Sequence, residues 1–302
     1  MKTKLLILLV FIGFQHVYAQ NWLTTLFTPG TGVKVDTVGN LPAAIGGTSS
    51  LFFLDGRLYS CNDHGRLTLY AIDSVTAAIV DSIPLGQSVL DMEEVALDER
   101  YIYFGDIGDN KGTRNNLRIL RLDRGDLYDP SPRFDTIAFS WPDRTPHNAR
   151  DFDCEAFVVT DTSIVLFTKQ WLSNATALYA IPKSAGSWRA VPLGTLETDG
   201  LVTGATFLAG RRLLVLCSYT QLCVPFVYMV YDFKGTDFTG GRRRRLTLPL
   251  GIGCQTEGIA TTDGLRYHLT CEHLNLYGIE HPAQLFRLDL DDFLGDYLRG
   301  GQ

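Results

Sequence analysis

The sequence predicts an all-β protein, a β-propeller of five four-stranded blades, with six blades as the alternative. Two observations carry this prediction. A segment of aromatic and branched residues recurs five times at intervals of roughly 50 residues, within the range of propeller blades. Two shorter strand-like segments that can form a hairpin precede each copy. The five copies span residues 67–73, 117–123, 177–183, 226–232 and 284–290.

The hairpins supply two strands of each predicted blade. In the first unit, residues 50–54 pair with 57–60 across Asp55-Gly56, a dipeptide that favours a tight hairpin turn. The later hairpins pair 94–97 with 101–104, 156–159 with 164–167, 205–208 with 213–216, and 258–260 with 267–270.

A fourth, outer strand follows four of the five copies. These strands are expected at 78–83, 133–139, 188–193 and 245–248. The fifth unit lacks one, and residues 33–38 resemble it, so we expect the N-terminal strand to close the last blade. Closure removes the open sheet edges that promote aggregation. A sandwich of irregular strands is the rival architecture.

Composition and the N-terminus define the class of protein. The chain has 302 residues, 45% of them hydrophobic, and a net charge of -6, which gives no electrostatic case for binding nucleic acid. Residues 1–19 read as a signal peptide, with two lysines, an apolar run at 5–14 and a Val-Tyr-Ala cleavage site. The run is too short to span a bilayer comfortably. We therefore expect one propeller domain at 20–302, exported as a monomer to the periplasm or the cell exterior.

Two local features have structural interpretations. The run Arg242 to Arg245 is expected to be a solvated edge strand, or else a contact for phosphate or a partner. Six cysteines in an oxidising compartment can pair. The predicted turns favour Cys217 with Cys223 and Cys254 with Cys271, as optional staples.

Alignment of the five hairpins places two polar rings at one mouth of the central channel. Inner strands should begin at Ser50, Glu93, Glu155, Gly204 and Glu257. The second strands should end at Asn62, Asp106, Lys169, Ser218 and Glu272. Further acids lie beside Glu93 and Glu155, and Asp109 and Asn110 follow Asp106.

Converging carboxylates raise one another's pKa unless a cation neutralises them, and hard oxygen ligands favour calcium. The expected calcium ligands are Glu93, Asp106, Asp109, Asn110, Glu155 and Glu257. Alternatively, each glutamate caps a neighbouring strand by binding backbone amides. The expected ligand-binding set is Asn62, Lys169, Ser218 and Glu272.

Catalytic residues cannot be assigned from motifs, because no G-x-S-x-G, H-E-x-x-H, P-loop or dinucleotide fingerprint occurs. Lys169 is either an internal counter-ion of the acidic ring or a group that holds an anionic substrate. His64 and His273 would be neighbours after ring closure and could do acid and base work, or they are ordinary loop residues.

Several motifs together resemble a family of exported bacterial propeller-like proteins of unestablished activity. The segments that carry this resemblance are 91–96, 103–110, 151–157, 166–169, 200–205 and 255–260, of which Asp106-Ile-Gly-Asp-Asn110 is the most specific. More distantly, Glu257-Gly-Ile-Ala is similar to a motif of calcium-dependent propellers of the esterase-like phytase and gluconolactonase groups. That second resemblance implies a metal-centred hydrolase.

The sequence thus predicts an exported propeller that binds a small molecule, glycan or peptide at an acidic, calcium-containing channel mouth, without catalysis. The alternative is a metal-dependent hydrolase of phosphate esters or lactones, in which the metal activates water.

Overall fold

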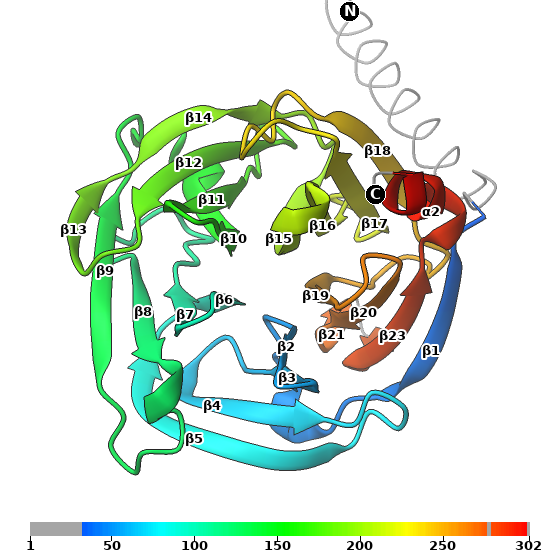
Figure 1. Cartoon of the computed structure of the whole chain (residues 1–302), viewed down its shortest axis with the longest axis horizontal. Helices are drawn as coiled ribbons and strands as arrows, with labels where there is room; N and C mark the ends of the chain where they lie inside the picture. Colours follow the sequence, from blue (N-terminus) through cyan, green and yellow to red (C-terminus); the bar gives the residue numbers. More distant parts are fainter. Residues whose placement is uncertain (1–31, 277–278, 301–302) are drawn as a thin grey trace, which may run out of the picture. The chain divides into compact units, whose positions relative to one another are not determined.

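Five β-sheets stand around a central axis in the computed structural model, which describes residues 32–276 and 279–300 (Figure 1). Each sheet is one propeller blade, so the predicted five-bladed architecture is confirmed. The signal peptide predicted at 1–19 lies outside the described residues. Among the described residues, no helix is long and apolar enough to cross a membrane.

The blades follow one another along the chain. Blade 1 comprises β2 (Phe52–Leu54), β3 (Arg57–Ser60), β4 (Gly65–Ile72) and β5 (Ile79–Val89). Blade 2 comprises β6 (Met92–Leu97), β7 (Tyr101–Asp106), β8 (Arg118–Asp123) and β9 (Phe134–Ser140). Blade 3 comprises β10 (Asp153–Val159), β11 (Ser163–Lys169), β12 (Thr176–Pro182) and β14 (Val191–Leu196). Blade 4 comprises β15 (Leu201–Leu208), β16 (Leu213–Tyr219), β17 (Pro225–Tyr231) and β18 (Arg242–Thr247).

Blade 5 joins the two ends of the described chain. It comprises β19 (Thr256–Thr261), β20 (Arg266–Cys271), β23 (Gln284–Asp289) and, outermost, β1 (Lys34–Asn40). β1 pairs antiparallel with β23, from Lys34 opposite Asp289 to Asn40 opposite Gln284. The predicted closure by the N-terminal strand is therefore confirmed, and β1 and β23 lie side by side in Figure 1.

The prediction for the third outer strand is partly wrong. Its first half, β13 (Gly186–Arg189), leaves blade 3 and pairs in parallel with β9 of blade 2. Only β14 pairs with β12. The outer edge of β9 would otherwise carry unpaired backbone groups, and β13 covers it.

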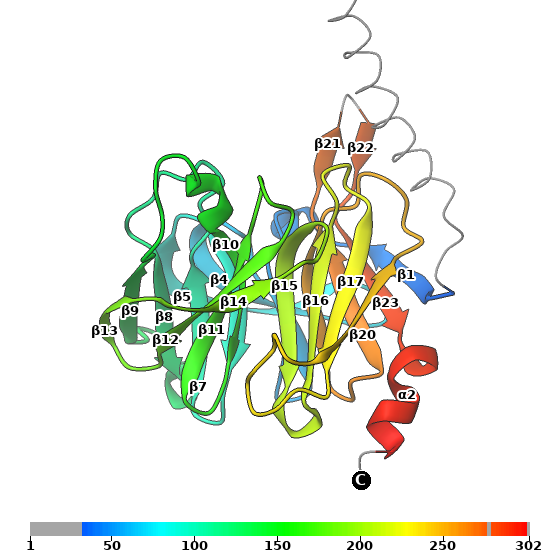
Figure 2. The ribbon, with the colours of Figure 1, turned by 90° about the horizontal axis from the view of Figure 1, so that it is seen from above.

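Short helices and a hairpin complete the described chain. The helices are η1 (Ala43–Ile45), η2 (Arg124–Asp126), η3 (Ala149–Phe152), η4 (Ala209–Arg211) and α2 (Asp291–Gly300). The hairpin of β21 (Leu274–Leu276) and β22 (Ile279–His281) projects from one face of the ring (Figure 2). α2, which the sequence analysis did not predict, packs Tyr297 on Tyr231 with ring centroids 5.1 Å apart.

Five apolar clusters form the core, one at each junction between neighbouring blades. The arginine run forms most of β18, as predicted for an outer strand, and Arg245 lies over the Phe226 ring at 3.8 Å. The blades thus bury their faces against each other, and the inner strands leave one free edge each toward the channel.

Candidate functional site

Four inner strands carry a β-bulge at the same step. In β6, Met92 pairs with Asp106 and Glu94 with Gly105, so that Glu93 is the extra residue. The equivalent extra residues in β10, β15 and β19 are Glu155, Thr203 and Glu257. A bulge leaves one residue unpaired and redirects its side chain. The bulges therefore give Glu93, Glu155 and Glu257 equivalent positions around one end of the channel.

The bulges correct the sequence alignment in two blades. Thr203, not Gly204, occupies the glutamate position of blade 4. In blade 1 the same one-residue shift falls between Thr48, which pairs with Asn62, and Phe52, which pairs with Tyr59. Of the residues between them, Ser49 lines the channel mouth and Ser50 does not, so Ser49 is the functional equivalent.

The sequence alignment of the second strands is also displaced by one residue in some blades. Asn62, Asp106 and Ser218 each pair with the residue before the bulge, whereas Lys169 is one residue farther along. Because side chains alternate along a strand, a shift of one residue turns a side chain to the other face. The structural equivalents of Lys169 are Asp63, Ile107, Tyr219 and Glu272, of which all but Ile107 line the channel mouth.

These side chains enclose a polar cavity of about 130 Å³ at this mouth. Its lining residues are Thr48, Ser49, Asp63, Asp91, Glu93, Asn110, Glu155, Lys169, Trp171, Tyr219, Gln255, Glu257 and Glu272. Six of them carry carboxylates and one, Lys169, carries an ammonium group. We call this space the acidic cavity.

Lys169 is held on three sides. Its Nζ lies 3.1 Å from Glu155 Oε1, and both side chains are buried. The ammonium also lies 4.8 Å from the centre of the Trp171 ring and 5.3 Å from that of Tyr219, positions that favour cation–π attraction. Burial alone lowers the pKa of Lys169, but Glu155 and the other nearby anionic groups raise it well above its usual value. Lys169 is therefore a charged counter-ion of the cavity.

One ammonium does not compensate the acids. Burial raises the pKa of Glu93 well above its usual value, and the charges of Glu155 and Asp91 raise it further. Burial also raises the pKa values of Glu155 and Glu257, in the second case with the help of Glu272. Lys169 Nζ, which lies 3.1 Å from Glu155 Oε1, is the one ammonium in the cavity lining. The cavity thus retains capacity for further positive charge.

Asp106 lies outside the cavity lining and is already neutralised. Its Oδ1 lies 2.8 Å from Arg114 Nη2 and its Oδ2 lies 3.0 Å from Arg118 Nε. Asp109 accepts hydrogen bonds from two backbone amides and lies 2.9 Å from Arg144 Nη2. Both aspartates fasten the loop after β7, and of the predicted ligands in this loop only Asn110 reaches the cavity.

Close packing of the loop backbone on neighbouring carboxylates accounts for the glycine at position 108 of this motif. A Cβ atom at Gly108 would overlap Glu93 Oε1 and the Asp91 carboxylate, so any larger residue would displace these two side chains. The loop backbone therefore forms a wall of the acidic cavity, pressed directly against two of its carboxylates.

Four other predicted residues lie away from the cavity lining. Asn62 donates to the Ala44 carbonyl at 2.8 Å, and Ser218 is fully buried. His64 and His273 are exposed. His64 Nδ1 lies 2.5 Å from Asp63 Oδ1, and the backbone amide of His273 donates to the Gly46 carbonyl.

The alignment missed Asp63, Tyr219 and Gln255, which all line the cavity. Asp63 and Tyr219 each directly follow an aligned position, so a one-residue offset at Asn62 and Ser218 would have identified them. Gln255 precedes β19 and donates to the Tyr219 hydroxyl at 3.0 Å. Gln255 opens the motif at 255–260, two residues before Glu257, and that position was the available signal.

The donor set fits calcium in chemistry, because it consists of carboxylate, amide and hydroxyl oxygens. Within residues 32–276 and 279–300, however, no three Asp, Glu, His or Cys side chains are grouped closely enough to hold a metal ion. Calcium ligation by Glu93, Glu155 and Glu257 therefore stays a prediction, and it requires side-chain movement.

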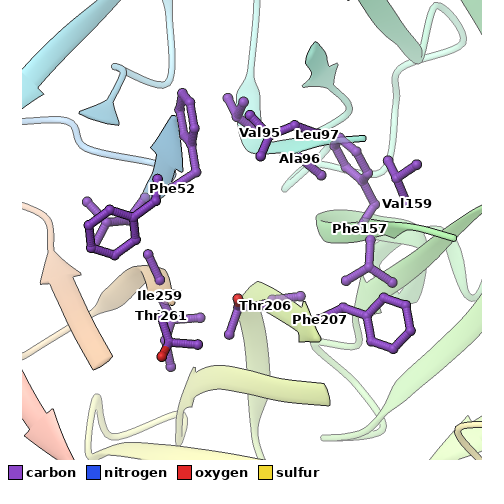
Figure 3. Close-up of a pocket in the computed structure, with 15 residues that line it drawn as sticks. Phe52, Val95, Ala96, Leu97, Phe157, Val159, Thr206, Phe207, Ile259 and Thr261 are labelled. Carbon is purple, nitrogen blue, oxygen red and sulfur yellow. The ribbon is translucent and has the colours of Figure 1, made fainter. Parts of the chain in front are cut away.

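Most side chains at the opposite end of the channel are apolar. Three consecutive residues from each blade, in or next to its inner strand, surround a cavity of about 170 Å³ there, including Phe52, Phe157 and Phe207 (Figure 3). Its lining contains no titratable side chain. Glu94 lies between the two cavities along β6, where it accepts hydrogen bonds from Val95 N at 3.0 Å and, across the channel, from Ala205 N at 2.8 Å.

The predicted disulfides are absent, since all six cysteines are free thiols in the structure. Cys217 is buried in β16, where its Sγ lies 3.9 Å from Thr203 Oγ1. Cys271 donates weakly to the Pro282 carbonyl, and its hydrogen bond with Cys254 lowers its pKa.

Comparisons with known proteins support the fold alone. The sequence matches no family model and no curated protein. An exo-β-1,3-galactanase from Phanerochaete chrysosporium, solved with galactose, aligns with a TM-score of 0.51 at 8% identity, over 88% of this chain and 65% of that one. An aldose sugar dehydrogenase from Streptomyces coelicolor, solved with PQQ bound, gives 0.48 at 13% identity, over 86% and 99%. A putative 6-phosphogluconolactonase from Bacteroides uniformis gives 0.40 at 14% identity, over 81% and 71%.

Proposed function

We propose that this protein is an exported binding protein whose acidic cavity takes up a cationic group, with calcium as the expected ion. The observation that carries the proposal is the imbalance of charge: six carboxylates and one ammonium line the same small cavity. Buried groups of like charge are energetically costly when no counter-ion lies between them. A further cation in the cavity relieves that cost.

Glu93, Glu155 and Glu257 are the residues that would hold the ion, because all three line the acidic cavity. Asn110 and Gln255 also line the cavity, and each carries an amide oxygen. Calcium would supply the positive charge that the carboxylates lack. Since the pKa values of these glutamates are raised, uptake of a cation is expected to release protons.

Binding is preferred to hydrolysis because the candidate catalytic groups are not free for a substrate. Lys169 is paired with Glu155, and His64 and His273 lie outside the cavity lining. A hydrolase of phosphate esters would also need a cationic group that faces the cavity and is free to hold the anionic substrate.

A calcium titration followed by thermal unfolding and calorimetry tests the proposal. We expect stabilisation of about 2.7 kcal/mol at a calcium concentration one hundred times Kd. Glu257→Gln should weaken calcium affinity at least tenfold, while Glu99→Gln, an exposed glutamate in a turn, serves as the matched control. Absence of any calcium-dependent shift in the parent protein at millimolar concentration would refute calcium binding.

A further inference from the structure

Three loops form a continuous arc beside the acidic cavity, on the face where Lys169, Tyr219 and Gln255 enter it. These are residues 170–175 after β11, 220–224 after β16 and 248–255 before β19. The Gln221 side chain donates to the Trp171 carbonyl and to Asn174 Oδ1, both at 3.0 Å. The Gly253 amide donates to the Cys223 carbonyl at 3.0 Å. The loops of blades 3, 4 and 5 are thus linked side by side.

Each loop of this arc exposes one large apolar side chain. Leu172 is 56% exposed, Leu222 is 51% exposed and Ile252 is 38% exposed. Leu172 directly follows Trp171, whose ring lines the acidic cavity. The apolar arc therefore adjoins the charged site.

The hairpin of β21 and β22 stands next to the arc. A Cβ atom at Gly253 would lie 2.4 Å from His281 Nε2, so the β22 side chain packs directly on the third loop. Figure 2 shows the hairpin rising beyond the blades on one face of the ring. It forms a wall at one end of the arc.

We propose that the arc and the acidic cavity together dock a polypeptide partner, whose lysine or arginine side chain enters the cavity while its apolar neighbours contact Leu172, Leu222 and Ile252. This inference rests on the proposed function, since it needs a cavity that accepts a cation. A bare metal ion or a small amine makes no use of apolar side chains outside the cavity. A basic residue flanked by apolar residues uses both features.

The interior of the cavity fits a side-chain cation. Ser49 Oγ is buried, lines the cavity and has no hydrogen-bond partner among the described residues. A lysine ammonium has three donors and an arginine guanidinium has five. Lys169 already shows how this environment holds an ammonium, between a carboxylate and two aromatic rings.

A pair of random short-peptide libraries tests the docking surface with the intact protein. One library has a central lysine and the other has norleucine, which keeps the side-chain length without the charge. We expect enrichment from the lysine library only, with apolar residues selected beside the lysine. Equal recovery from both libraries, or no preference at the flanking positions, would overturn the proposal.

Variants separate the arc from the cavity. Leu172→Asp with Leu222→Asp should weaken the selected peptide at least tenfold and leave the calcium titration unchanged. Val75→Asp, at a residue 68% exposed after the far end of β4, is the matched control and should change neither. Unchanged peptide affinity in the arc variant, or butylamine binding as tight as the peptide, would contradict docking on the arc.

The two proposals fail differently. Calcium binding without peptide enrichment would overturn the docking surface and leave cation binding intact. Peptide enrichment that Glu257→Gln does not reduce would also overturn it, because the cation would then bind elsewhere. Failure of calcium, peptide and butylamine alike would overturn the proposed function itself.

Discussion

Glu94 of blade 2 spans the channel to Ala205 of blade 4, with Oε2 accepting a hydrogen bond from the backbone amide at 2.8 Å. The two blades are not neighbours in the ring. Ala205 lies on the innermost strand of its blade, whose channel-facing edge has no partner strand. The contact is thus the strand capping that the sequence analysis weighed for the glutamate ring, made instead by the residue after the bulge.

Glu94→Ala is expected to destabilise the protein by about 3 kcal/mol, because two buried amides lose their acceptor. Glu94→Gln should cost less, since its amide oxygen can still accept one bond. Urea unfolding measures both, with Glu99→Ala as the exposed control. Equal midpoints for Glu94→Ala and the parent would contradict this role.

Asp106→Asn should cost about 3 kcal/mol, because it leaves Arg114 and Arg118 without their buried counter-charge. The same variant should retain its calcium response if it remains folded, since Asp106 is outside the acidic cavity. Loss of calcium binding in a folded Asp106→Asn protein would return this residue to the ligand set predicted from its motif.

The glutamates of the acidic cavity should make stability fall as pH rises. Their pKa values are raised in the folded state, so it keeps protons that the unfolded chain releases above about pH 4.3. Glu257→Gln removes one such group, and its stability relative to the parent should improve from pH 5 to pH 8. Urea unfolding measures the difference in unfolding free energy between Glu257→Gln and the parent. A difference that stays constant with pH would contradict the raised pKa of Glu257.

Asp98 should affect the pH dependence of stability in the opposite direction to the glutamates. Burial raises its pKa, but hydrogen bonds from Lys183, Tyr101 and Tyr103 outweigh that effect and lower it to about 2. Asp98→Asn should therefore lose stability relative to the parent above about pH 4, and the loss should vanish toward pH 2.

Lys169→Met removes the ammonium group from the acidic cavity. Breaking a buried pair costs about 3–5 kcal/mol, and the loss should be larger at pH 8 than at pH 5, because more of the carboxylates are then ionised. The same change should increase calcium affinity, since a competing cation is gone. Weaker calcium binding by a folded Lys169→Met protein, measured by calorimetry, would show that Lys169 supports the ligand instead of competing with it.

The repeat and its closure were predictable because each blade repeats the same strand pattern, and because β1 resembles the strand that blade 5 lacks. The orientation of side chains at the channel mouth was predictable only in part. Glu93, Glu155, Lys169, Glu257 and Glu272 line the acidic cavity as the alignment predicted, whereas Asn62, Asp106 and Ser218 do not. The bulges at Glu93 and Thr203 add one residue to a strand without a sequence signal, and one residue decides which face a side chain occupies. The neutralisation of Asp106 depends on arginines in the following loop and strand, whose reach only the fold determines.

Ring closure also determines the order in which the strands can pair during synthesis. β1 pairs with β23, and Lys34 lies opposite Asp289, so the first strand of the ring to be synthesised must wait for the last before either has its final partner. Blade 5 cannot form on a nascent chain, and a propeller halted partway would expose a complete strand edge at each end. Completion of the ring is therefore a post-synthetic step.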